Sequence, residues 1–184
     1  MKFKVTPQSI PDVLLIEPTV FADDRGYFIE SYNLNDFDEF LPGVKFVQDN
    51  ESKSSRGVLR GLHFQKAPHA QAKLIRVIQG SIWDVAVDIR PESSTFKQLC
   101  FAEITAENHF QFFVPRGFAH AFLVLSDTAI VQYKTDNFYY PQSDAGIHPH
   151  DSDLNIPWPL PNEEHLLSDK DLLLPFLLDL AVGH

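Results

Sequence analysis

The central part of the chain, residues 44–140, is a succession of short apolar runs rich in β-branched and aromatic residues. Glycine, proline, asparagine or aspartate separates most runs from the next. The runs are KFVQDN, GVLRGLHF, AKLIRVIQ, SIWDVAVDIR, FKQLCFAEI, FQFFVP, FAHAFLVL and AIVQYKTD. Short strands at close spacing, with turn residues between them, are typical of a β-sandwich or a β-barrel. We therefore predict a mainly β fold.

One run, SIWDVAVDIR, shows the alternation of a strand with one buried and one exposed face. Its apolar residues would lie on one face and its charged residues on the other: Trp83, Val85, Val87 and Ile89 against Asp84, Asp88 and Arg90. Gly80 and Ser81 separate this run from LIRVIQ. Because two turn residues suffice for a tight connection, we expect the two runs to form an antiparallel hairpin.

Two segments outside this region predict short peripheral helices. NLNDFDEFLPG offers Asn33 or Asn35 as an N-cap and ends at Pro42-Gly43, and SDKDLLLPFLLDL offers Ser168 as a cap but is interrupted by Pro175. We expect both helices to pack on the β-domain.

Composition bounds the size of the fold and its partners. The 184 residues, 44% of them hydrophobic, show no internal repeat and no linker-like segment, so residues 1–184 are expected to form one domain. The formal net charge of -10 disfavours nonspecific binding to nucleic acid or to an anionic membrane. A local basic pocket is compatible with that charge.

Cysteine content and the first residues indicate the compartment. Cys100 is the single cysteine, which excludes an internal disulfide and a multi-cysteine metal site. The start MKFKVTPQSIPDV lacks the apolar core of a signal peptide, and no apolar run is long enough for a membrane span. We expect a cytoplasmic protein.

Three polar residues fall on the apolar face of their own predicted strand. Alternation groups them as follows: Lys73 with Ile75 and Val77, His120 with Phe118, Phe122 and Val124, and Tyr133 with Ala129 and Val131. Taken singly, Lys73 can extend to solvent, His120 can be a hydrogen-bonded core residue, and Tyr133 can belong to the core. With His63 in VLRGLHFQ they make a set of four. Burying an unpaired polar side chain costs free energy, so four of them are better explained by one shared site than by separate positions in the core. The pattern predicts a polar pocket inside a barrel.

Metal binding is one use of such a pocket, with His63, His69 and His120 as ligands. The spacing argues against it, because Gln65 occupies the position where a second histidine on the same strand would complete a pincer. His148 and His150 form another pair in GIHPHD, but the proline between them in a polar stretch predicts an exposed loop. We expect no metal.

Proton transfer at carbon is the second use, and the residue types suit it. A histidine takes a proton near neutral pH, a lysine cation stabilises an oxyanion, and a tyrosine returns a proton. Removal of a hydrogen next to a carbonyl requires this division of labour in a site that excludes bulk water.

The motifs also resemble a known family. PDVLLIEPTVFADDRGYFIESYN, VQDN, VLRGLHFQ, PRGFAHAF and LSDKD, in this order and at these separations, resemble the dTDP-4-dehydrorhamnose 3,5-epimerases of the cupin superfamily, over about residues 10 to 175. The resemblance implies a cupin-type antiparallel β-barrel, or jelly roll, that is a homodimer without metal or cofactor. It implies inversion of C3 and C5 of the nucleotide sugar dTDP-4-dehydro-6-deoxyglucose on the pathway to dTDP-rhamnose.

By the same resemblance, four residues carry the chemistry. His63 would be the base, Tyr133 the acid on the opposite sugar face, and Lys73 the cation that neutralises the enolate at O4. Asp171 would pair with the base histidine, with Asp169 as its rival for that role.

The remaining family positions would bind the substrate. Arg60 would contact the diphosphate through its fork of donors. The other positions implied are Arg25, Glu30, Gln48 and Asn50 at the nucleotide, Asp49 in the same VQDN segment, Tyr139 stacked on thymine, and His120, Asp144 and Lys170 as further contacts.

The sequence departs from the family pattern at three places. Asp144 replaces a glutamate, Ala121 replaces the glycine of GFAHGF, and GIHPHD replaces a segment that carries tryptophan. We expect these changes to lie at the substrate rim, where they would loosen nucleotide preference. They leave room for an enzyme that epimerises one carbon or isomerises a related ketosugar; a noncatalytic binding module and a metal-dependent cupin are the alternatives from other classes.

Overall fold

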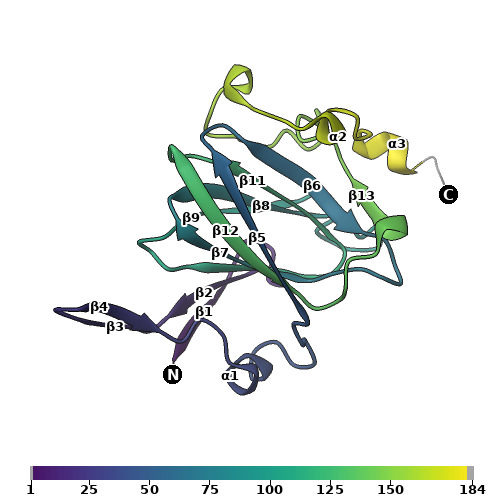
Figure 1. Ribbon diagram of the computed structural model, residues 1–184. Coiled ribbons are helices and arrows are strands. Elements are labelled where there is room, and N and C mark those ends of the chain that lie inside the picture. Colours follow the sequence, from purple (N-terminus) through teal and green to yellow (C-terminus); the bar gives the residue numbers. More distant parts are fainter. Residues whose placement is uncertain (1, 182–184) are drawn as a thin grey trace.

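A computed structural model describes residues 2–181, and it consists mainly of strands in antiparallel sheets (Figure 1). The first sheet has six strands, in the order β1 (Phe3–Pro7), β2 (Leu14–Pro18), β10 (Gln111–Val114), β7 (Lys73–Gln79), β12 (Thr128–Thr135) and β5 (Gln48–Ser55). The second has five, in the order β13 (Asp144–Gly146), β6 (Leu59–Gln65), β11 (Phe118–Val124), β8 (Ser81–Asp88) and β9 (Leu99–Thr105). The predicted mainly β, antiparallel fold is confirmed.

The main core lies between the two sheets. Its buried residues come from both: from the first sheet Ile75, Val77, Phe112, Val114, Ala129 and Val131, and from the second Ile82, Ala86, Cys100, Ile104, Phe118, Phe122 and Val124. They include all the apolar neighbours that strand alternation assigned to Lys73, His120 and Tyr133. The predicted placement of those three polar side chains on the inward faces of the strands is therefore confirmed.

The exposed face predicted for β8 is wrong. Asp84 and Asp88 are fully buried, because this strand is covered on both sides. Val85 and Val87 point outward from the barrel and pack under Ile147 and other residues of the segment that follows β13. Asp84 and Asp88 are therefore on the inward-facing side of the strand, which the alternation had assigned to solvent.

The predicted hairpin at Gly80-Ser81 is also wrong. β7 pairs with β10 and β12, whereas β8 pairs with β9 and β11, so the chain crosses from one sheet to the other at this point. Gly80 has φ +77°, and a Cβ on it would lie 2.2 Å from the carbonyl oxygen of Thr128. The glycine therefore makes a tight turn between sheets.

Strand β5 extends well beyond its predicted run. Of KFVQDN only the last three residues are in the strand, which continues through the polar sequence ESKSS to Ser55. This strand is the last of its sheet and pairs only with β12. Every second residue along it is exposed, so that face needs no apolar pattern. Strands also form before the predicted region, in β1 and β2.

The helices are short and peripheral. They are α1 (Leu34–Asp38), α2 (Asp169–Leu172) and α3 (Leu177–Ala181), with single 3-10 turns at Pro141–Ser143 and Asn162–Glu164. The Asn33 side chain caps α1 by accepting from the backbone of Asn35, and the Ser168 side chain caps α2 by accepting from the backbone of Asp171. Both predicted caps are confirmed.

The exposed loop predicted for GIHPHD is wrong. Pro149 is buried, and its carbonyl accepts a hydrogen bond from the Trp158 indole at 3.0 Å. His150 Nε2 lies 2.8 Å from His165 Nδ1, and His148 and His150 are half-buried. The segment is packed under the later loops because it covers the outer face of the second sheet.

A two-stranded hairpin, β3 (Val20–Asp23) and β4 (Gly26–Ile29), projects from the barrel in Figure 1 on the side away from β13. It carries exposed Phe21, Tyr27 and Phe28. Among the described residues, no helix is both long and apolar enough to span a bilayer.

Candidate active site

A bulge in β6 turns Arg60 and His63 toward the same face. Residues three apart in a regular strand point to opposite faces. Here His63 pairs with His120 and Arg60 pairs with Phe122, so that two residues of β6 oppose one residue of β11. Because opposed residues share a face, both side chains belong to the inward-facing side. The bulge explains how one short run presents an arginine and a histidine together.

Gly61 makes the bulge possible. Its φ is +121°, and a Cβ at this position would lie 2.6 Å from both the Ala121 Cβ and the His120 carbonyl oxygen. Ala121 is buried behind the bulge on the outer face of the sheet. The expectation that Ala121 lies at the substrate rim is therefore wrong. GIHPHD likewise covers the outer face, and of the three departures Asp144 alone lines the inner cavity.

His63 is held by Asp171 of α2. The His63 Nε2 lies 2.6 Å from Asp171 Oδ1, and Asp171 is buried while the His63 side chain is one-third exposed. Burial alone would raise the pKa of Asp171, but the hydrogen bonds from His63 and Ser168 and the attraction of His63 outweigh it and hold that pKa below its usual value. Asp169 is exposed at the start of α2. The geometry thus brings Asp171, and not Asp169, to the histidine.

Lys73 extends into the interior beside His63, and its ammonium donates to the His63 carbonyl oxygen at 3.2 Å. Burial lowers the pKa of Lys73 to about 8, against the opposing attraction of Asp84 and Asp144. His120 donates from Nε2 to Asp84 Oδ1 at 2.5 Å, and burial lowers the pKa of His120. Asp84 Oδ2 is buried and has no hydrogen-bond partner within the described residues, so its charge acts on Lys73 through space.

Tyr133 lies on the inner face of the first sheet, where it pairs with Ile75 of β7 and Asn50 of β5. Burial raises its pKa, and the nearby Arg60 charge offsets part of that effect. The Arg60 Nε donates to Ser54 Oγ at 3.1 Å. The phenol therefore stays protonated at neutral pH, next to a cation suited to an anionic ligand.

These groups meet in a cavity of about 350 Å³. The predicted site residues that line it are Gln48, Asn50, His63, Lys73, Tyr133, Tyr139, Asp144 and Lys170. At its rim, Asp144 Oδ2 accepts from Lys170 at 2.5 Å and from the Tyr139 hydroxyl at 3.2 Å. A groove of about 960 Å³ lies elsewhere, between β1, β3 and α1. None of the predicted catalytic residues lines that groove, so the smaller cavity is the candidate active site.

Five predicted contacts do not line the cavity. Arg60 and His120 lie next to it, since Arg60 acts on Tyr133 and His120 pairs with His63 across the strands, whereas Asp49, Arg25 and Glu30 lie away from it. Asp49 points outward and pairs with Lys134 at 2.8 Å, because it alternates with Gln48 and Asn50 along β5. Arg25 is in the projecting hairpin, where it pairs with Asp23.

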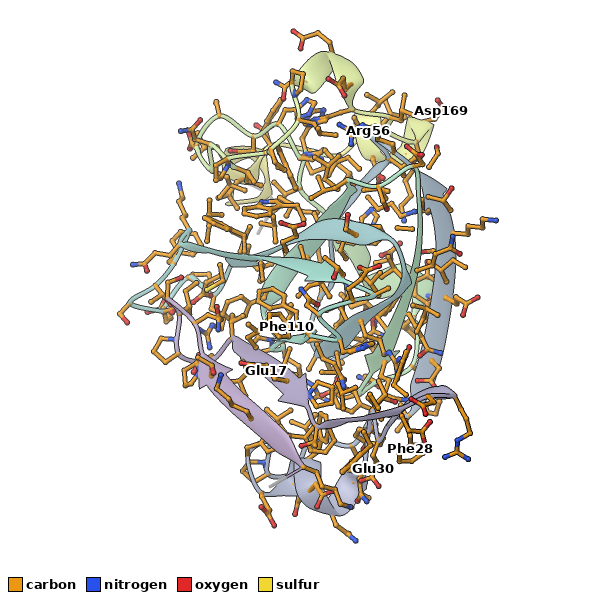
Figure 2. All side chains as sticks on the ribbon, turned by 90° about the vertical axis from the view of Figure 1, so that its left-hand side faces the viewer. Glu17, Phe28, Glu30, Arg56, Phe110 and Asp169 are labelled. Atoms are coloured by element: carbon orange, nitrogen blue, oxygen red, sulfur yellow. The ribbon has the colours of Figure 1, made fainter. Side chains whose placement is uncertain are left out.

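Glu30, which follows that hairpin, pairs with Lys2 at 3.0 Å. Figure 2 shows Glu30 and Phe28 at the lower end of the molecule and Asp169, the first residue of α2, at the upper end. Neither Arg25 nor Glu30 reaches the cavity of its own chain.

Sequence reasoning missed four residues at this site. Asp84 lies behind the cavity, and Phe64, Gln65 and Gln71 line it. The alternation of apolar residues predicted that Asp84 is exposed to solvent. Gln65 was considered only because it stands where a second histidine would be needed for a metal site. Within the described residues, no group of three or more histidine, cysteine, aspartate or glutamate side chains is arranged to hold a metal ion.

Comparison with known proteins identifies the family of this site. The sequence profile described as dTDP-4-dehydrorhamnose 3,5-epimerase matches residues 7–179. The chain belongs to that epimerase family. A relative from Escherichia coli K12, named dTDP-4-dehydrorhamnose 3,5-epimerase, is 52% identical over 171 residues, which cover 92% of this chain and 91% of the relative.

Solved structures of other epimerases share the fold. The crystal structure of the Legionella pneumophila epimerase RmlC in complex with dTDP-4-keto-L-rhamnose has a TM-score of 0.92 and 42% identity, and covers 96% of this chain and 93% of that one. The structure of ChmJ, a 3'-monoepimerase from Streptomyces bikiniensis, in complex with dTDP-quinovose has a TM-score of 0.90 and 34% identity. The match covers 96% of this chain and 90% of ChmJ. The epimerase described here is thus an isomerase with the cupin-type barrel that the motifs implied.

Proposed function

We propose that this epimerase inverts C3 and C5 of dTDP-4-dehydro-6-deoxyglucose and so produces dTDP-4-dehydro-L-rhamnose for dTDP-L-rhamnose synthesis. The observation that carries the proposal is the convergence of the His63–Asp171 pair, Lys73 and Tyr133 on one cavity. C3 and C5 both flank the C4 ketone, so one enolate chemistry serves both carbons. The side chains supply a base, an acid and an oxyanion partner, with no demand for a metal or a cofactor.

His63 begins the reaction as the base. Its Nε2–H donates to Asp171, which leaves the lone pair of Nδ1 to take the proton from the sugar carbon. As that C–H bond breaks, its electron pair forms the C–C double bond of the enolate, and the carbonyl electrons move to O4. The Asp171 carboxylate then stabilises the imidazolium that has formed.

Lys73 holds the negative charge on O4. An ammonium in a low-dielectric cavity stabilises an oxyanion more strongly than it would in water. Asp84 keeps this ammonium charged in spite of its burial, because the carboxylate raises the pKa of Lys73. The cation must be present for this role, so the activity depends on protonated Lys73.

Tyr133 returns a proton on the opposite face of the sugar. Its O–H bond breaks, the enolate carbon gains the proton, and O4 regains its carbonyl bond. The phenolate then takes a proton from solvent while the imidazolium releases one, so that each inversion leaves the enzyme and the atom count unchanged. Removal and return on different faces give inversion rather than simple exchange.

Nucleotide binding involves the outer part of the cavity. Arg60 is proposed to contact the diphosphate, and Tyr139 to stack on the thymine ring, with Gln48 and Asn50 at the nucleotide. His120, Asp144 and Lys170 complete the substrate contacts. These local cations explain how a chain of net charge -10 holds an anionic ligand.

The protein is proposed to act as a cytoplasmic homodimer of single-domain chains. Arg25 and Glu30 cannot serve their own cavity, but the hairpin that presents Arg25 also exposes Phe21 and Phe28. An apolar projection of this kind favours docking on a second copy, where the two charged residues would reach the partner's nucleotide. A cytoplasmic location suits the nucleotide-sugar substrate and the free, buried Cys100.

The test is a product assay with dTDP-4-dehydro-6-deoxyglucose and the chelator-treated protein. A product that a 4-dehydrorhamnose reductase converts to dTDP-rhamnose, confirmed by proton NMR, supports the proposal. A product inverted only at C3 would instead favour monoepimerase activity. The likeness to ChmJ and the shorter Asp144 at the rim are the two observations that favour that second candidate.

A further inference from the structure

Gln65 lies two residues after His63, at the end of β6, and its side chain is buried. Both of its donors and its acceptor oxygen make hydrogen bonds inside the protein. Its Nε2 donates to the His69 carbonyl oxygen at 2.6 Å and to the Phe138 carbonyl oxygen at 3.2 Å. Its Oε1 accepts from the backbone N–H of Tyr140 at 2.7 Å. The side chain thus joins two loops that are about 70 residues apart in sequence.

These contacts fix the segment on both sides of Tyr139. Gln65 holds the residue before it and the residue after it, and His69 stacks on the Tyr140 ring with centroids 3.9 Å apart and planes at 17°. Tyr139 itself donates its backbone N–H to Gln48 Oε1 at 3.1 Å, while its ring remains about half exposed at the rim. The backbone is anchored and the ring is presented to the cavity.

We propose that Gln65 is a positioning residue of the nucleotide subsite, one that sets the 138–140 segment so that Tyr139 can stack on a planar base. The inference rests on the proposed function, which assigns a nucleotide to this rim. A neutral amide is the chemistry that the position requires, since it supplies two donors and one acceptor together. A carboxylate would supply no donor, and an imidazole would supply at most one donor together with an acceptor.

Preorganisation is the physical benefit. A ring on an unanchored segment would lose conformational freedom on binding, and that loss would subtract from the affinity for the base. Gln65 itself makes no bond to the reacting sugar in this account, because its donors and acceptor are already engaged. Its replacement should therefore change nucleotide affinity and KM, and leave kcat at saturation nearly unchanged.

The experiment compares Gln65→Glu with the wild-type protein at pH 8.5 by calorimetry with dTDP and by epimerase kinetics. The introduced carboxylate would face two carbonyl oxygens. We expect the Kd for dTDP and the KM to rise about tenfold, within the range that base stacking on an aromatic ring contributes, with kcat changed less than about twofold. Lowering the pH to 6 should restore part of the affinity relative to wild type, because burial against two carbonyl oxygens raises the pKa of the introduced carboxyl and its neutral form can donate. Gln98→Glu, at an exposed position, makes the same charge change and should have no effect.

A cycle with Tyr139→Ala decides whether Gln65 acts through that ring. In the Tyr139→Ala background, Gln65→Glu should weaken dTDP binding by less than about twofold. A full tenfold loss in both backgrounds, or a fall of kcat without a rise of KM, would overturn the proposal. If Gln65→Glu does not fold, Gln65→Asn, which is one methylene shorter, must show the same rise of KM. A wild-type protein that fails to bind dTDP would refute the proposed function itself, whereas normal wild-type binding with an unaffected variant would refute the role of Gln65 alone.

Discussion

Replacing Lys73 with methionine is expected to stabilise the protein while it abolishes catalysis. The ammonium lies in the interior cavity, and its pKa is lowered from 10.5 to about 8 by burial. At about 1.4 kcal/mol per pH unit, that displacement corresponds to about 3 kcal/mol against the folded state whenever the lysine is charged. Methionine has a similar length and no charge, so Lys73→Met should raise the free energy of unfolding by up to about 3 kcal/mol at pH 7.

The sign of the pH dependence follows from linkage. Below pH 8 the lysine is protonated in both the folded and the unfolded protein, so burial of its charge lowers the stability of the wild type by the full amount. Between about pH 8 and 10.5 the folded protein loses the proton first, so the cost falls and the advantage of the variant shrinks toward zero. The same titration predicts that wild-type kcat/KM declines above about pH 8, because the neutral amine cannot stabilise the enolate.

The assay is urea unfolding of both proteins at pH 7 and pH 10, with Lys53→Met as the control. Lys53 is exposed on the outer side of β5, and its replacement should leave the stability unchanged. Two results would refute the assignment of a buried charge to Lys73. One is a Lys73→Met protein that is no more stable than wild type at pH 7; the other is a gain in stability that is as large at pH 10 as at pH 7. Substantial epimerase activity in the variant would refute the oxyanion role.

Three further substitutions test the other parts of the site. Asp171→Asn keeps the shape of the side chain but removes the charge that holds the His63 tautomer, so kcat should fall by at least about a hundredfold. The affinity for dTDP, measured by calorimetry, should stay unchanged. Activity near that of the wild type would refute the catalytic role of the His63–Asp171 pair. Tyr133→Phe should still exchange sugar protons with solvent yet invert poorly in an NMR assay, and full inversion would exclude it as the acid. Gly61→Ala would place a Cβ 2.6 Å from the Ala121 Cβ and should cost about 3 kcal/mol in chemical unfolding; a neutral effect would contradict the account of the bulge.

Strand alternation succeeded where a polar residue interrupts an otherwise apolar face. Lys73, His120 and Tyr133 could be assigned to the interior because their i±2 neighbours are apolar, and those neighbours form the core between the sheets. It failed for Asp84, because β8 is buried on both faces. No alternation rule can tell which of two buried faces is the inner one.

Other features depend on contacts between distant residues. The shared face of Arg60 and His63 requires a bulge that period-2 reasoning cannot foresee, although Gly61 between them was a sequence signal for one. The partner of His63 came from a resemblance, and the geometry then separated Asp171 from its neighbour Asp169. The role of Gln65 was invisible in sequence because its three contacts are all with backbone atoms of other loops.

The central claim is that His63 removes the protons at both C3 and C5. It is tested most directly by proton NMR of dTDP-4-dehydro-6-deoxyglucose in deuterated buffer, with wild-type protein and His63→Asn side by side. We expect deuterium at both carbons with the wild type and at neither with the variant, although the variant still binds dTDP. Exchange at both carbons by His63→Asn at a rate near that of the wild type would contradict it.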